Sequence, residues 1–149
     1  MTKNDEKEML RVILCKPDEV AEVVELEDDL ESMQALVGGY IQEYMPFTGG
    51  DPRYDDVAII CNEEGKMMRL PPNRAIKDED GRVMDIIAGS FFICYAPIES
   101  ERFLSMPEDL EEEFRKRYEL PEMFYRTGTD LISVKYEPEP RAKGGDICR

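Results

Sequence analysis

Two short, almost uniformly apolar runs limit the fold of this chain more than any other feature. Residues 57–61 read VAIIC and residues 91–95 read FFICY. Runs of this length and character are typical of strands buried on both faces. The segment between them carries Asn, Arg, Pro and Gly at close spacing. Polar groups held between buried strands are a common location for ligand sites, so this segment is the first place to look for one.

The remaining pattern predicts a single α+β domain over residues 9–136, with a mixed or antiparallel sheet of about five strands and two main helices. A polar tail (1–8) precedes the domain, and a disordered tail (137–149) follows it. The predicted strands cover residues 9–15, 20–26, 40–47, 56–61 and 86–96. The predicted helices cover residues 28–37 and 107–118, with a shorter helical piece at 99–106. Residues 48–56 are expected to form a flexible connection, residues 70–74 a short helical or irregular segment, and residues 123–136 a marginal strand or helix.

Charge narrows the classes of partner. The chain has 34 acidic and 19 basic residues and a net charge of −15. Phosphate-driven binding depends on Lys and Arg, and here the acids far outnumber the bases, so direct nucleic-acid binding and membrane binding are not expected. Acids concentrate at 18–31, with eight acids and no base, and at 108–113, with five acids in six residues. These two segments predict one negative surface for a basic protein partner, with simple solubility as the alternative explanation.

Missing residue types exclude several chemistries. The chain has no His, which removes Ser-His-Asp and Cys-His catalysis and most zinc hydrolase sites. No C-x-x-C pair is present, so no metal and no cofactor are expected. Three of the four cysteines (Cys15, Cys61, Cys94) lie in apolar runs, which predicts buried, reduced thiols in a cytoplasmic protein. No apolar run is long enough to predict a transmembrane helix.

The candidate ligand-binding residues are Asn62, Asn73, Arg74 and Gly89. Two prolines restrict the backbone before Asn73 and Arg74, so the planar fork of Arg74 is held ready for a phosphate, a carboxylate or a backbone carbonyl. Asn62 is expected to reach the same ligand across its turn. Gly89, within a predicted strand, marks a bulge or a close approach of backbone or ligand. A structural network, in which Asn73 and Arg74 satisfy loop carbonyls, is the alternative.

Four blocks of sequence resemble the domain-of-unknown-function family 3846. They read LESMQALVGGYI at 30–41, CNEEGK at 61–66, LPPNR at 70–74 and DIIAGSFF at 85–92. The likeness extends over residues 9–118. It implies a small cytoplasmic accessory protein of Gram-positive gut bacteria, their phages or their conjugative elements. The family has no established activity, so the resemblance implies no catalytic residue.

Together these observations predict a protein that binds and is not an enzyme, in a phage or mobile-element context. The favoured form is an acidic protein–protein module that inhibits a host defence enzyme or another nucleic-acid-binding protein by occupying its groove. The alternative is a binder of a small anionic, nucleotide-like ligand that uses the 62–74 loop. The oligomeric state is left open.

Overall fold

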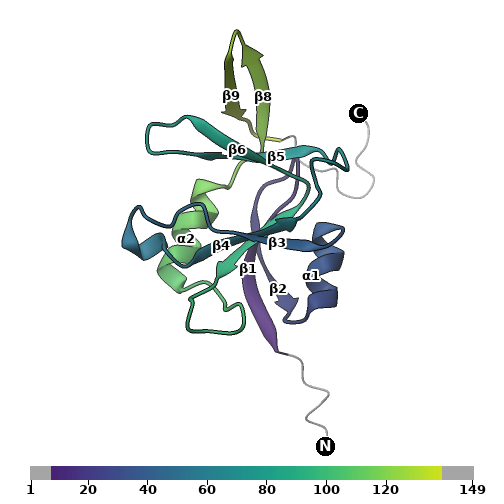
Figure 1. Ribbon diagram of the computed structural model, residues 1–149, viewed down its shortest axis with the longest axis vertical. Helices are drawn as coiled ribbons and strands as arrows, with labels where there is room; N and C mark the ends of the chain where they lie inside the picture. Colours follow the sequence, from purple (N-terminus) through teal and green to yellow (C-terminus); the bar gives the residue numbers. More distant parts are fainter. Residues whose placement is uncertain (1–7, 139–149) are drawn as a thin grey trace, which may run out of the picture.

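The two apolar runs form neighbouring central strands of one antiparallel sheet in the computed structural model, which describes residues 8–138 (Figure 1). This main sheet has five strands in the order β2-β1-β7-β4-β3. They are β1 (Met9–Cys15), β2 (Glu22–Glu27), β3 (Ile41–Tyr44), β4 (Val57–Asn62) and β7 (Phe91–Tyr95). With two helices beside the sheet, the predicted α+β class is confirmed.

Alternating side chains of the central strands serve two separate cores. Val12, Ala58 and Ile60 face one side of the sheet and pack with Met33 and Val37 of helix α1 (Leu30–Val37). The other side faces helix α2 (Glu108–Arg117) and the hairpin of β5 (Pro72–Lys77) and β6 (Val83–Ala88). Its core includes Ile13, Ile59, Ile93, Ile76, Ile87, Leu110 and Phe114. A strand that is apolar at every position is therefore needed wherever both faces are covered.

The helix ends follow their capping residues. Asp29 caps α1 by accepting a hydrogen bond from the Ser32 N–H at 2.7 Å, and Gly38 ends it in the left-handed conformation. Helix α2 starts after Pro107. It carries three acids in its first turn and three bases in its last turn. That order of charge complements the helix dipole. Both helices lie where the sequence predicts them, within one or two residues at each end.

Three predicted segments are wrong. Residues 70–74 do not begin a helix, because β5 starts at Pro72 and pairs with β6. Residues 86–96 do not form one long strand. Gly89 has a φ of 87° and turns the chain, so β6 belongs to a separate two-stranded sheet while β7 enters the main sheet. Residues 99–106 are not helical, and their regular structure is a bridge between Leu104 and Tyr95.

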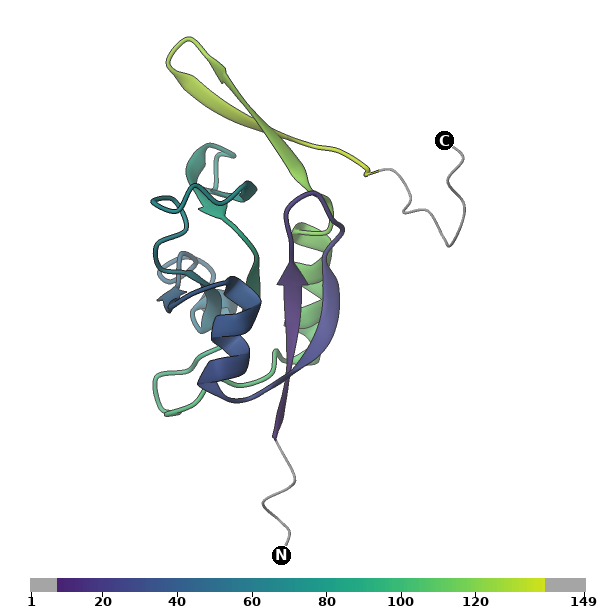
Figure 2. The same cartoon turned by 90° about the vertical axis from the view of Figure 1, so that its right-hand side faces the viewer.

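The last two strands form a hairpin apart from both other sheets. Strands β8 (Glu122–Thr127) and β9 (Asp130–Lys135) pair with each other, which settles the strand-or-helix alternative for 123–136. Figures 1 and 2 show this hairpin extending beyond the rest of the fold, above β5 and β6. The predicted tails lie outside the described residues, apart from positions 8, 137 and 138. Neither helix of the described part is long and apolar enough to cross a membrane.

Candidate functional site

Arg74 is completely buried and donates all of its N–H groups to acceptors of its own chain. Its Nε donates to the Tyr118 carbonyl at 3.0 Å. One terminal nitrogen donates to the Lys16 carbonyl at 3.2 Å and to Asn73 Oδ1 at 2.8 Å. The other donates to the carbonyls of Glu19 at 2.8 Å and Glu119 at 3.3 Å. Because a guanidinium has five N–H donors, these five bonds leave none for a ligand.

Asn73 and Gly89 belong to the same arrangement. The Asn73 amide donates to the Cys15 carbonyl at 2.9 Å and to the Gly89 carbonyl at 2.8 Å. Asn73 therefore ties β1 to the turn between β6 and β7, while its oxygen holds the Arg74 fork. We use the name Arg74 network for Asn73, Arg74 and the six residues whose backbone carbonyls they bond: Cys15, Lys16, Glu19, Gly89, Tyr118 and Glu119. The geometry favours the structural alternative for these residues.

Several elements of the fold meet at the buried side chain of Arg74. Burial lowers the pKa of Arg74, although Cys15 and Glu122 act in the opposite direction. Glu122 is buried too, and its Oε1 accepts a hydrogen bond from the Ala75 N–H at 3.0 Å. The β1–β2 turn, β5, the end of α2 and the start of β8 therefore meet at Arg74.

Asn62 lies in a separate structural contact. Its amide donates to the Val37 carbonyl at 3.1 Å, and its Oδ1 accepts from the Glu64 N–H at 2.7 Å. A Cβ placed at Gly39 would lie 2.8 Å from Asn62 Nδ2, so the chain needs glycine there. Asn62 thus fixes the end of α1 to the end of β4. The structure brings Asn73, Arg74 and Gly89 together and leaves Asn62 apart from them.

The two acid-rich segments meet at Arg11. Arg11 lies opposite Glu25 in the β1–β2 pair. Its Nε donates to Glu111 Oε1 of α2 at 2.8 Å, and a second nitrogen donates to Oε2 at 3.1 Å. The pKa of Arg11 is raised, first by the hydrogen bond to Glu111 and its charge, and then by Glu25 and Glu108. Acids from positions 18–31 and 108–113 therefore share one neighbourhood.

More acids adjoin this neighbourhood along the first turn of α2. Burial raises the pKa of Tyr95, and the charges of Asp56, Asp109 and Glu99 raise it further. Glu25, Glu99, Glu108 and Asp109 are exposed, while Asp56 is partly exposed. We call these five carboxylates the acidic surface. They come from β2, the segment before β4, the turn after β7 and the start of α2.

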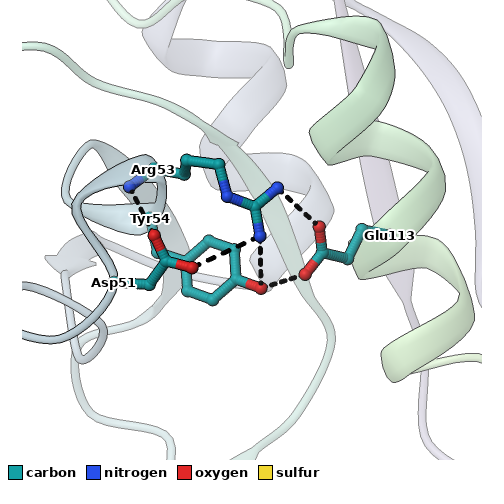
Figure 3. Close-up of polar contacts among 4 residues, drawn as sticks. All are labelled: Asp51, Arg53, Tyr54 and Glu113. Atoms are coloured by element: carbon teal, nitrogen blue, oxygen red, sulfur yellow. Dashed lines mark hydrogen bonds and ion pairs between the residues drawn. The ribbon is translucent and has the colours of Figure 1, made fainter.

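Other acids of α2 are occupied by local cations. Glu112 pairs with Arg115 at 3.4 Å and Lys116 at 3.5 Å. Glu113 accepts from the Tyr54 hydroxyl and pairs with Arg53 at 3.3 Å, as Figure 3 shows. Fewer acids are therefore unpaired at the surface than the segment 108–113 contains, because Glu112 and Glu113 are neutralised by these cations.

The contact in Figure 3 was missed by sequence reasoning. Residues 48–56 were expected to be a flexible connection, but a 3₁₀ turn (Pro52–Tyr54) packs Tyr54 edge-on against Phe114, with ring centroids 5.1 Å apart. Asp51 caps this turn by accepting from the Arg53 N–H at 3.0 Å. Arg117 lies over the Phe47 ring at 4.8 Å and the Phe114 ring at 5.2 Å. The Asp-Pro at the start of the turn was the available signal.

The three strand cysteines are free and buried, as the sequence predicts. Burial raises the pKa of Cys15 to about 12 and that of Cys61 to about 11, and it raises the pKa of Cys94 as well. Arg74 near Cys15 and Lys66 near Cys61 oppose this shift without reversing it. Within residues 8–138, no three His, Cys, Asp or Glu side chains are grouped to hold a metal ion.

Two surface hollows of the described part are bordered by residues outside the Arg74 network. One of about 670 Å³ is bordered by residues 46–51, Tyr54, residues 77–80, Met84 and Arg117. Another, of about 280 Å³, lies beside Asn62 and is bordered by residues 61–67 and 85–88 with Gln42 and Tyr44. Of the four predicted ligand residues, Asn62 borders the second of these two hollows, and neither hollow includes Asn73 or Arg74.

A family comparison matches most of the folded part of the chain. The model of the family described as Domain of unknown function (DUF3846) matches residues 10–119. The chain belongs to this family. No curated protein and no solved structure matches it.

The sequence blocks that carry the likeness to DUF3846 coincide with the structural contacts above. Gly39 and Asn62 meet at the end of α1, and Asn73, Arg74 and Gly89 meet at the Arg74 network. The match ends at residue 119, before β8 begins. The matched region thus contains the residues of the Arg74 network and the Asn62 contact.

Proposed function

We propose that this protein is not an enzyme and that it binds a basic surface of a partner protein through its acidic surface. The observation that carries the proposal is that Glu25 of β2 and Glu108 of α2 act on the same cation, Arg11, whose guanidinium is already paired with Glu111. A net charge of −15 steers a basic partner toward the molecule, and local carboxylates then fix its position.

We further propose what kind of protein this partner is. Carboxylates presented together resemble phosphates to a basic groove, so the partner is a nucleic-acid-binding protein, such as a host defence enzyme that acts on phage or mobile-element DNA. Under this proposal the protein works in the cytoplasm and occupies that groove. The small-ligand alternative has less support, because the five donors of Arg74 are all bonded within the chain.

An oligolysine peptide with a fluorescent label tests the acidic surface without a known partner. We expect the double variant Glu25→Gln/Glu108→Gln to bind this peptide several-fold more weakly than the wild type. Glu63→Gln/Glu64→Gln is the matched control, because it removes the same charge from two exposed residues outside the acidic surface. Equal weakening in both variants would mean that the total charge alone attracts the peptide, and it would contradict a localised surface.

A further inference from the structure

A third hollow, of about 720 Å³, lies between the turn of the β5–β6 hairpin and the β8–β9 hairpin. It is bordered by Lys77, residues 81–83 and residues 129–133, and we call it the hairpin hollow. Figures 1 and 2 show the β8–β9 hairpin extending above β5 and β6, so two segments far apart in the sequence form its walls. The hairpin hollow shares no residue with the Arg74 network or the acidic surface, and it is therefore a separate place in the fold.

Two cations border the hairpin hollow, Lys77 at the end of β5 and Arg82 in the turn before β6. Among residues 8–138, neither of these side chains forms an ion pair. Carboxylates do pair with six other cations: Arg11, Arg53, Lys66, Arg102, Arg115 and Lys116. Because the chain has 34 acids and only 19 bases, two cations left unpaired at one hollow are a local exception.

The acids of the same turn border a different hollow. Residues 78–80 are all acidic, and they line the hollow of about 670 Å³ described above. Asp78 Oδ1 is held within the turn, where it accepts hydrogen bonds from the N–H groups of Asp80 and Arg82, both at 2.9 Å. One acid, Asp130, borders the hairpin hollow itself. Two cations against one carboxylate make this hollow a local positive site on an acidic protein.

A buried hydroxyl borders the same hollow. Ser133 Oγ is buried and bonds to no group of the described residues. Leaving a buried polar group without a hydrogen bond costs free energy, so such a group needs an explanation. A ligand oxygen in the hairpin hollow would supply the missing partner. Thr129 adds a second hydroxyl to the border.

We propose that the hairpin hollow binds the phosphate group of a small phosphorylated molecule. A phosphate monoester carries nearly two negative charges at pH 7 and three acceptor oxygens. Lys77 and Arg82 match the charge, and the planar fork of an arginine fits phosphate oxygens. The hydroxyls of Thr129 and Ser133 donate to the remaining oxygens. At physiological salt, exposed charges act over about 8 Å, so the local cations outweigh the net charge of the whole chain.

Titration of the isotope-labelled full chain with phenyl phosphate, at constant ionic strength, tests this proposal by NMR. The wild type is expected to bind with a millimolar dissociation constant and with shifts of the amide signals of residues 77–83 and 129–133. Lys77→Gln/Arg82→Gln should weaken binding at least tenfold. Lys16→Gln/Arg69→Gln is the matched control, because it removes the same charge from two exposed cations outside the hairpin hollow, and it should bind like the wild type.

Ser133→Ala separates a ligand contact from a structural one. The alanine loses no hydrogen bond within the described residues, so the denaturation midpoint should be equal to or above that of the wild type. Binding of phenyl phosphate should nevertheless weaken several-fold. Absence of saturable binding to the wild type, equal weakening in the matched control, or a folded Ser133→Ala variant with wild-type affinity would overturn the proposal.

The hairpin hollow and the acidic surface can be tested separately. Glu25→Gln/Glu108→Gln should bind phenyl phosphate at least as tightly as the wild type, because it removes negative charge. Lys77→Gln/Arg82→Gln should bind oligolysine at least as tightly as the wild type, because it removes positive charge. Loss of phosphate binding with intact peptide binding, or the reverse, therefore shows which of the two surfaces has failed.

Discussion

At the scale of single residues, Arg74 bonds to acceptors of its own chain with the same N–H groups that would otherwise bind a ligand. Its fork reaches carbonyls that are far apart in the sequence, from Lys16 and Glu19 to Tyr118 and Glu119. The sequence identified Asn73 and Arg74 as chemically important. It did not identify their acceptors, because backbone carbonyls have no signature in the sequence.

Arg74→Ala should destabilise the fold strongly. Each buried carbonyl left without a donor costs roughly 1–3 kcal/mol, and at least the Tyr118 carbonyl loses its bond from Arg74 in a buried position. Arg74→Lys should recover only part of the loss, because an ammonium lacks the planar five-donor fork. Chemical denaturation measures the free energy of unfolding, and Arg82→Ala at an exposed arginine is the control. An unfolding free energy equal to that of the wild type would restore the ligand hypothesis for Arg74.

The buried thiols predict a specific dependence on pH. A cysteine thiol in the unfolded chain has a pKa of about 8.5. In the folded protein, burial raises the pKa of Cys15 to about 12 and that of Cys61 to about 11. The unfolded state therefore binds fewer protons above its own pKa, so stability is complete below that pH and falls as the pH rises toward the folded values. Denaturation midpoints measured at several alkaline pH values check this, and a Cys61→Ala variant should lose less stability over the same range.

The same thiols should react slowly in the native protein. In a Cys148→Ser variant, which leaves only the three buried cysteines, iodoacetamide at about pH 8 should modify none of them rapidly, because the reactive thiolate is scarce and the sulfur is covered. Concentrated guanidinium chloride should expose all three. Rapid modification of any thiol under native conditions would show that its strand opens readily.

At the scale of helices and strands, the sequence predicted the elements that have a local signal and missed those that depend on tertiary contacts. Both helices and the two buried central strands were found, because helical periodicity and uniform apolar runs are local signals. The division of 86–96 was missed. Its apolar residues continue across Gly89, and only the tertiary fold sends β6 and β7 to different sheets. For the same reason, Asn62 and Arg74 lie close in sequence but make different contacts in the fold.

Gly89 is expected to be far less tolerant of alanine than Gly81. Both have positive φ, at 87° and 85°. A Cβ at Gly89 would lie 2.7 Å from Leu70 Cδ1, whereas a Cβ at Gly81 would meet no atom within 4 Å. Gly81→Ala should cost roughly 1–2 kcal/mol from the backbone alone. Gly89→Ala should cost about 1–3 kcal/mol more because of overpacking. Equal unfolding free energies for the two variants would show that Leu70 moves aside without cost.

At the scale of the whole molecule, the fold decides which acids pair with cations, and composition does not show this. The net charge of −15 was available from the sequence, and so were both acid-rich segments. Their meeting at Arg11 depends on the packing of α2 against β1, and the neutralisation of Glu112 and Glu113 depends on Arg53, Arg115 and Lys116. No pattern within either segment predicts the long-range pairs of Arg11 with Glu111 and of Arg53 with Glu113.

The salt dependence of oligolysine binding tests the central claim, that the acidic surface is a binding surface, most directly. The dissociation constant would be measured from low to physiological salt for the wild type and for Glu25→Gln/Glu108→Gln. We expect wild-type binding to weaken steeply as salt rises. The variant should bind more weakly and with a shallower slope, because fewer local charges contribute. Wild-type binding that is insensitive to salt, or a variant with the same affinity and slope as the wild type, would contradict this claim.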